Sequence, residues 1–213
     1  MEGKLESYLF STAKNIFAWV SFKSEAPVSC STMSTQKTVR QQADVVEENE
    51  LRLDQEKAEQ VVEALNTELA NAYVLYHQLK KHHWVVEGAE FLPLHKFLEE
   101  AYEHVEEGAD VIAERAQALG GVPVSGPSNQ EARATVEFEG EDVYDVRTMF
   151  QNDLEMYGDI IESMRDSIEL AENLGDYATA EILREILVTL EDDGHHFEHY
   201  LEDDTLVLEE ATK

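Results

Sequence analysis

Scarce residue types exclude several classes of protein. Cys30 is the only cysteine, so no disulfide can form within the chain and a reducing compartment is compatible with it. No apolar run approaches the ~20 residues that a membrane-spanning helix needs, so we expect a cytoplasmic protein without a membrane partner. Basic residues number 16 against 46 acidic residues, which gives a net charge of −30. A surface of this sign repels nucleic acid and attracts cations.

Hydrophobic residues, in contrast, are plentiful. They make up 43% of the 213 residues, which is too much for a disordered chain and enough for the buried core of one domain. The acidic residues must therefore lie on a folded surface. Such a surface is typical of a halophilic protein that stays hydrated in a high-salt cytoplasm. The same carboxylates would also collect metal cations, but only at specific positions.

Residues 1–32 differ in composition from the rest of the chain. Their three lysines balance three acidic residues, so the remainder carries the whole net charge. The apolar stretch 16–20 is too short for the core of a signal peptide. We interpret residues 1–32 as an atypical extension translated upstream of a start at Met33; a flexible tail or a targeting segment are the alternatives. Residues 33–53 and 204–213 are then the N-terminal and C-terminal tails.

Helical periodicity dominates the domain that we expect at residues 54–203, and no β-strand pattern of comparable length occurs. The apolar patterns predict four long helices at about 54–88, 91–119, 142–174 and 176–201. Asp54 and Asp176 would cap the first and the last of them, and Gly175 would end the third. A short extra helix is expected near 128–134. Two tight connections and one long crossover predict an all-α, ferritin-like four-helix bundle.

Histidine and acidic residues recur around the junction of the first two helices. His83 ends the first helix, and His95, Glu99, Asp110 and Glu114 lie along the second. On a helical wheel with His95 at 0°, Glu99 falls at about 40°, Asp110 at about 60° and Glu114 at about 100°. These residues form one stripe beside the apolar face. Imidazole and carboxylate groups suit iron, so the stripe is a candidate metal site.

The spacing of these residues prevents one chain from completing the site alone. His95 and Asp110 are 15 residues apart, or about 22 Å along a helix, whereas metal–ligand bonds are ~2 Å. A two-fold dimer with antiparallel second helices would place His95 of one chain beside Asp110 and Glu114 of the other. A site within one bundle normally needs two Glu-x-x-His motifs. The nearest candidates begin at Asp193 and His196 and therefore fail.

The residues around this junction resemble a known family. The matching runs are Lys80-x-x-His83-Trp84-x-Val86-x-Gly88-x-x-Phe91-x-x-Leu94-His95 and Asp110-x-x-Ala113-Glu114-Arg115. They resemble the Dps family of mini-ferritins, over about residues 54–203. The resemblance implies a hollow shell of twelve subunits with a two-iron ferroxidase site between the subunits of each dimer. It also implies that His83, His95, Asp110 and Glu114 bind iron and carry out the oxidation, with Glu99 where the family usually has Asp.

The resemblance further implies an activity. The protein would oxidise Fe(II), with hydrogen peroxide as the favoured oxidant, and store Fe(III) as a mineral core that protects against oxidative damage. The family name suggests an alternative, a DNA-binding nucleoid protein without a ferroxidase role. The tail before the first helix offers only Lys37 and Arg40 as cations among several acidic residues, so we expect no direct DNA binding.

One group of glutamates and one group of histidines each allow two interpretations. The first group is Glu103, Glu106 and Glu107. These side chains lie on the same stripe and form either a solvated acidic face or a nucleation site for ferric mineral. The second group is His195, His196 and His199. We expect surface or capping roles for these histidines, with iron transit as the alternative, because a metal motif without a matched partner is weak.

Predictions also concern four single residues. Three of them have a proposed functional or structural role, and the fourth has a predicted exposure to solvent. Asp176 and Glu181 lie where the family has its three-fold pores, although Asp176 is equally a helix cap. Trp84 either packs the helix end against the dimer seam or donates electrons near the iron. His82 points about 100° away from His83 on the wheel, so we expect it to face solvent.

Overall fold

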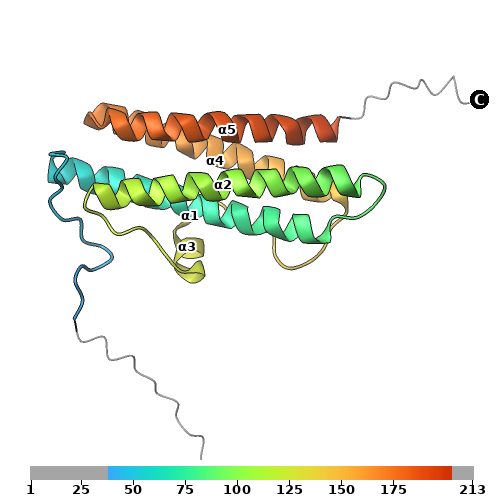
Figure 1. The fold of residues 1–213 in the computed structure, drawn as a ribbon, viewed down its shortest axis with the longest axis horizontal. Coiled ribbons are helices and arrows are strands. Elements are labelled where there is room, and N and C mark those ends of the chain that lie inside the picture. Colours follow the sequence, from blue (N-terminus) through green and yellow to red (C-terminus); the bar gives the residue numbers. More distant parts are fainter. Residues whose placement is uncertain (1–37, 203–213) are drawn as a thin grey trace, which may run out of the picture. The chain divides into compact units, whose positions relative to one another are not determined.

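The computed structural model describes residues 38–202. The predictions for residues 1–32, and for the tail segments 33–37 and 203–213, lie outside this range. Within it the chain forms five helices and no strand: α1 (Gln55–Val85), α2 (Phe91–Ala118), α3 (Pro127–Arg133), α4 (Val146–Leu174) and α5 (Tyr177–Leu201) (Figure 1). The predicted all-α class and the short helix in the crossover are confirmed.

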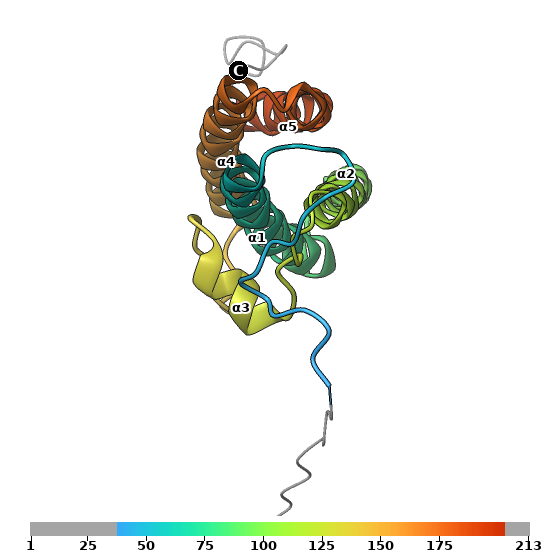
Figure 2. The same cartoon turned by 90° about the vertical axis from the view of Figure 1, so that its left-hand side faces the viewer.

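The four long helices pack around a common core. Helix α1 contacts α2, α4 and α3, while α5 contacts both α4 and α2. The end-on view shows α3 on the outer side of α1, away from this core (Figure 2). The connections from α1 to α2 and from α4 to α5 are short, so each pair is antiparallel. The long crossover containing α3 carries the chain back, so α2 and α4 run in the same direction (Figure 1).

Local side-chain chemistry sets several helix ends as predicted. The Asp54 carboxylate accepts a hydrogen bond from the second backbone N–H of α1, and Asp176 accepts one from Thr179 at the start of α5. Gly175 ends α4 in the left-handed region, with φ 84°. Helix α1 ends at Val85, before the predicted Gly88, which instead takes φ 111° in the turn.

The predicted start of α4 was wrong. The helix begins at Val146 rather than near Asp142, and Asp145 is its N-cap, accepting hydrogen bonds from the backbone and hydroxyl of Thr148. Val143, which falls inside the predicted helix range 142–174, is 64% exposed. The later start of α4 is explained by a contact with α1: the Asp142 carbonyl accepts a hydrogen bond from Lys81 Nζ at 2.5 Å. That contact holds the crossover along α1 before the helix can begin.

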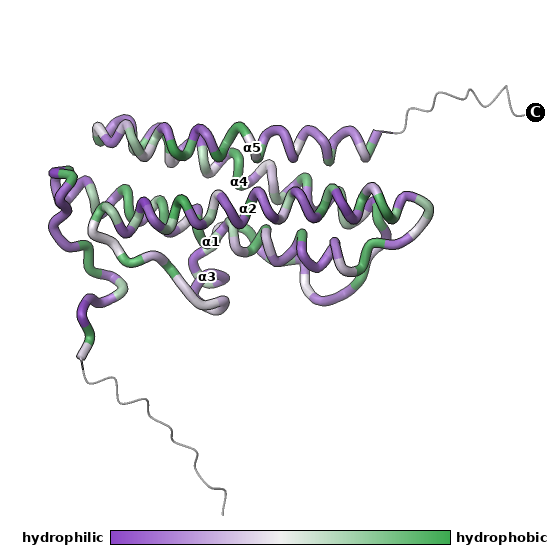
Figure 3. The backbone as a smooth tube through the Cα atoms, viewed as in Figure 1, coloured by the Kyte–Doolittle hydropathy of each residue, from purple (hydrophilic) through white to green (hydrophobic). Residues whose placement is uncertain are grey.

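The core is made by the apolar faces of all four long helices. Apolar and polar residues alternate along each helix (Figure 3), as expected for elements with one buried face. Phe150, Tyr157 and Phe197 are among the largest fully buried side chains, and the Phe197 ring lies 4.9 Å from Phe150 and 5.3 Å from Tyr157 between ring centroids. No helix among residues 38–202 is long and apolar enough to cross a membrane. The apolar core leaves the acidic face of α2 exposed.

Candidate metal centre

The turn between α1 and α2 brings two of the predicted ligands into contact. His83 lies in the last turn of α1, and His95 lies near the start of α2. His83 Nδ1 is 2.9 Å from the His95 carbonyl oxygen, and His95 Nδ1 is 2.8 Å from the His83 carbonyl oxygen. The two rings stack with their centroids 3.7 Å apart and their planes 19° apart. Each histidine therefore holds the other.

These reciprocal bonds set the tautomer of both neutral rings. A carbonyl oxygen can only accept, so each Nδ1 carries the proton and donates it. The lone pair of each ring is then on Nε2, the atom that remains for a metal. Tyr102 packs edge-on against His83 with 5.3 Å between centroids, and Phe91 lies 5.0 Å from His95. The surrounding rings thus fix the orientation of a preformed imidazole pair.

The predicted carboxylate ligands lie on the same helix but at different distances from this pair. Glu99, Asp110 and Glu114 are all exposed on α2. Glu99 is one turn from His95, whereas Asp110 is about 22 Å from it along the helix axis. Within residues 38–202, no three His, Cys, Asp or Glu side chains are close enough to hold one metal ion. One chain therefore presents a histidine pair at one end of α2 and a carboxylate pair towards the other.

A group of three glutamates occupies the stretch of α2 between these ends. Its members are Glu103, Glu106 and Glu107, and all three are exposed. They extend the acidic surface of α2 from the histidine end to the carboxylate end. The two interpretations, a solvated face or a nucleation site, both require this exposure.

Comparison with known proteins identifies the fold and its relatives. The family model of the ferritin-like domain matches residues 62–207. The DNA protection during starvation protein of Halobacterium salinarum is 63% identical over 180 residues, which cover 84% of this chain and 99% of that protein. The crystal structure of an archaeal Dps homologue from the same organism superposes with a TM-score of 0.79 over 84% of this chain and 99% of that one. The chain belongs to the Dps family.

More distant Dps relatives match over similar lengths. The nutrient stress-induced DNA-binding protein of a Nostoc species is 38% identical, covering 83% of this chain and 96% of that protein. A Dps structure from Vibrio cholerae, described as belonging to the ferritin-like diiron-carboxylate proteins, has a TM-score of 0.69 at 27% identity and covers 77% of this chain and 100% of that one. The predicted family and ferritin-like fold are confirmed. The ligand set is a separate matter, because none of these matches tests which residues of this chain bind iron.

The predicted exposure of His82 was wrong. Its side chain is fully buried, with Nδ1 2.7 Å from Asp153 Oδ2 and Nε2 2.6 Å from Glu139 Oε1. Burial disfavours the charged ring, but the two carboxylates outweigh burial and raise the pKa of His82. Asp153 comes from α4 and Glu139 from the crossover. A helical wheel of α1 does not show that α4 and the crossover cover His82, and this is why its burial was not predicted.

A buried polar network extends from His82. Lys81 Nζ donates to Glu139 Oε1 at 2.6 Å and to the Gly140 carbonyl at 2.8 Å, and Gln78 donates to Asp153 at 2.9 Å. Burial raises the pKa of Glu139, but hydrogen bonds from Lys81 and its other partners outweigh this effect and lower it. The network ties the crossover and α4 to the last turns of α1. It therefore supports the helix end that carries His83.

The sequence held a signal for this network. Buried polar residues of α1 recur at helical spacing on the side that contacts α4 and the crossover: Glu68, Asn71, Gln78 and His82. Glu68 accepts hydrogen bonds from two serines of α4, Ser163 and Ser167. Polar residues among the buried positions of a helix indicate polar partners from another element.

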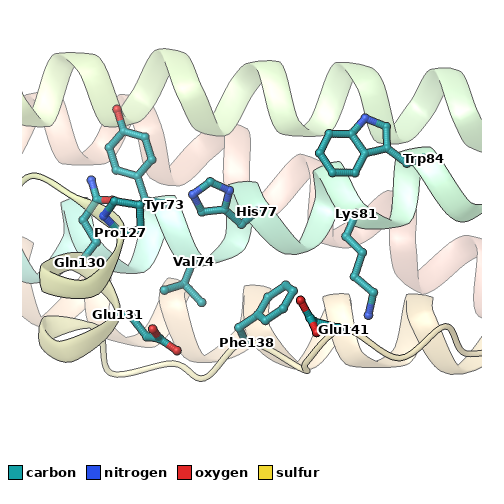
Figure 4. A pocket seen from close by; sticks show the side chains of 10 residues that line it. All are labelled: Tyr73, Val74, His77, Lys81, Trp84, Pro127, Gln130, Glu131, Phe138 and Glu141. Carbon is teal, nitrogen blue, oxygen red and sulfur yellow. The ribbon is translucent and has the colours of Figure 1, made fainter. Parts of the chain in front are cut away.

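Trp84 lies on the opposite side of α1 and is 69% exposed. It lines a groove of 470 Å³ between α1, α3 and the crossover, together with Tyr73, His77 and Phe138 (Figure 4). No segment of its own chain within residues 38–202 buries this indole. Packing at a dimer seam and electron donation both need a second chain or iron beside it, so both remain predictions.

The remaining singled-out residues lie near the ends of α5. Asp176 is buried, caps α5 and accepts a hydrogen bond from Arg115 at 2.6 Å, so the capping role is confirmed. Glu181 is exposed, and its pore role remains a prediction. The histidine cluster at the other end is also exposed, as expected for surface residues: His195, His196 and His199.

Proposed function

We propose that this Dps-family protein is a cytoplasmic ferroxidase that oxidises Fe(II) and stores the Fe(III) product as mineral. The observation that carries the proposal is the His83–His95 pair, whose reciprocal hydrogen bonds leave both Nε2 atoms for a metal. The pair lies beside an acidic stripe, so imidazole and hard oxygen ligands occur on one surface. The match to a structure described as a ferritin-like diiron-carboxylate protein also supports it.

The site is proposed to form between two chains. With α2 helices antiparallel across a two-fold axis, the histidine pair of one chain meets Asp110 and Glu114 of its partner, and each dimer contains two identical sites. Glu99 lies one turn from His95 and would join the same ligand set. Carboxylates can shift between terminal and bridging positions as iron changes charge, while the anchored imidazoles keep their place.

The proposed substrates are two Fe(II) ions and hydrogen peroxide. Each Fe(II) gives one electron, the peroxide O–O bond breaks, and two protons are taken up, so two Fe(III) ions and two water molecules form. The reaction removes both reactants of hydroxyl-radical chemistry. Fe(III) would then pass into a shell of twelve subunits, where the exposed glutamates of α2 supply oxygen ligands for the mineral.

Two substitutions test the proposed ligand set. We expect His83→Ala and Asp110→Asn each to slow rapid Fe(II) oxidation by about a hundredfold or more, since loss of outer-shell partners alone typically costs ~10–100-fold. The measurement is stopped-flow absorbance of Fe(III) formation after mixing with Fe(II) and peroxide. Two variants outside the proposed ligand set serve as controls, His196→Ala for an exposed imidazole and Glu100→Gln for an exposed carboxylate. Both controls should retain wild-type rates.

Sedimentation of each variant checks that the assembly is intact. If His83→Ala and Asp110→Asn form intact assemblies and oxidise Fe(II) at wild-type rates, the proposed ligand set is wrong. Equal slowing in the two controls would also contradict it, because a general loss of surface charge or packing would then explain the effect.

Direct DNA binding is the second candidate function. The names of two relatives favour it, since one is a DNA protection protein and the other a DNA-binding protein. The charge of this chain, −30, opposes it. We therefore propose that protection of DNA comes from removal of Fe(II) and peroxide rather than from contact with the duplex.

A further inference from the structure

Two histidines near the end of α5 direct their ring nitrogens at each other. His195 and His199 are separated by one helical turn on the exposed face of α5, and their Nε2 atoms are hydrogen-bonded at 3.0 Å. One of the two Nε2 atoms therefore carries a proton, which a metal ion bound by both would displace to solvent. Their ring centroids are 4.2 Å apart with planes at 69°. Neither ring belongs to the proposed iron-oxidation site, which lies on α1 and α2.

The separation of the two nitrogens matches a chelating geometry. For two metal–nitrogen bonds of ~2.0–2.1 Å, a right angle at the metal gives an N···N separation of about 2.9 Å, and a tetrahedral angle gives about 3.3 Å. The observed 3.0 Å lies near the right-angle value. Adjacent positions of a tetragonal or octahedral ion therefore fit this pair better than a tetrahedral site.

A neighbouring carboxylate favours the tautomer that coordination requires. Glu198 Oε2 lies 3.5 Å from His195 Nδ1. At this distance the carboxylate makes an ion pair rather than a hydrogen bond, and its negative charge favours a proton on the nearer nitrogen of His195, Nδ1. His196 faces elsewhere, since its ring packs edge-on against Phe97 with 5.9 Å between centroids. The exposed cluster thus separates into a convergent pair and one outlying ring.

We propose that His195 and His199 chelate a divalent transition-metal ion through their two Nε2 atoms. The ion is of the class that takes imidazole in a tetragonal or octahedral arrangement, with Cu(II) bound most tightly among first-row divalent ions. The site is complete within one chain. It does not depend on the proposed ferroxidase function, because no ligand is shared and no oxidation of iron is involved.

Copper(II) iminodiacetate tests the proposal on the full-length, assembled protein. This complex has adjacent open positions for two imidazoles and is too bulky to reach histidines that lie inside an interface. We expect calorimetry to show one complex bound per chain, with two imidazole nitrogens visible in the electron paramagnetic resonance spectrum. His195→Ala and His199→Ala should each weaken binding by at least about tenfold, because chelation by two linked donors becomes binding by one.

His196→Ala is the matched control, since it removes an exposed imidazole from the same turn of α5. It should bind the copper complex as the wild type does. Wild-type affinity in His195→Ala or His199→Ala would overturn the proposal, and so would an equal loss in His196→Ala. Circular dichroism of each variant shows whether the helices are retained; all three side chains are exposed, so we expect no loss of fold.

Discussion

At the scale of single residues, His83 and His95 show what a side chain's identity predicts. Their type and their places beside a helix turn were enough to propose metal ligands. The reciprocal Nδ1–carbonyl bonds were not predictable, because they depend on how the turn after Val85 brings two backbones together. Those bonds are what leave Nε2 for the metal. The types of ligand in the candidate site could therefore be predicted from the sequence. The hydrogen bonds that orient the two imidazole rings could not.

For the neighbouring residue His82, the sequence-based prediction was wrong: it was expected to face solvent, but its side chain is fully buried. Its ring bridges two buried carboxylates, Asp153 and Glu139. We expect His82→Ala to lower the free energy of unfolding by about 3 kcal/mol, because the fully buried Asp153 loses its imidazole partner and keeps only the hydrogen bond from Gln78, while Glu139 keeps Lys81. The measurement is denaturant unfolding at neutral pH.

The control for this prediction is an exposed histidine, His196→Ala, which should change the free energy of unfolding by ~0.5 kcal/mol or less. A loss in His82→Ala no larger than that of the control would contradict the role of the network. It would mean that water replaces the imidazole without cost to the fold.

At the scale of helices, periodicity predicted the long elements well and their connections poorly. Caps such as Asp54 and Asp176 have local signatures, so they could be predicted. The start of α4 could not, because Lys81 of α1 anchors the crossover at Asp142 and delays the helix to Val146. A contact between residues distant in sequence leaves no trace in the local pattern. For the network around His82, the spacing of polar residues on α1 was a signal, but it did not identify the partners, Asp153 and Glu139.

The two aspartates near the start of α4 give a test with a pH dependence. Asp145→Ala should lower the midpoint of thermal unfolding at neutral pH, because the N-cap bonds to Thr148 are lost. Those same bonds lower the pKa of Asp145 below its ordinary value of 3.8. Because the folded-state pKa is depressed, the stabilisation is present above pH 3.8 and disappears as the pH falls through the folded-state pKa.

The matched variant is Asp142→Ala, which removes an exposed carboxylate that caps nothing and keeps the carbonyl that Lys81 uses. It should leave the midpoint nearly unchanged at every pH. If Asp142→Ala were the more damaging of the two, or if the Asp145→Ala effect persisted at low pH, the assignment of the cap would be wrong.

At the scale of the whole molecule, net charge is our main argument for preferring iron oxidation to DNA binding. A shell of twelve such chains would carry a net charge of about −360. This charge would repel DNA, which is also a polyanion. We expect no retardation of duplex DNA in a gel-shift assay even at low salt, where counterion release favours binding most. A basic protein of similar size is the control for the assay. A saturable shift with this protein would restore the DNA-binding alternative.

The sequence predicts that a second chain completes each iron site, and this stays a prediction because a single chain does not show the dimer. Helical rise separates His95 from Asp110 by about 22 Å, and the structure keeps both on one uninterrupted helix, α2. No closer ligand set converges within residues 38–202. The central claim is therefore that two chains complete each iron site.

Mixed assemblies test this claim most directly. One chain would carry His83→Ala with His95→Ala, and the other Asp110→Asn with Glu114→Gln; each alone should lack rapid Fe(II) oxidation. When the two are dissociated and reassembled together, half of the dimers are mixed, and each mixed dimer has one intact site. We predict recovery of about one quarter of the activity of wild type treated in the same way. Mixed assemblies that form but stay inactive would contradict a site shared between chains.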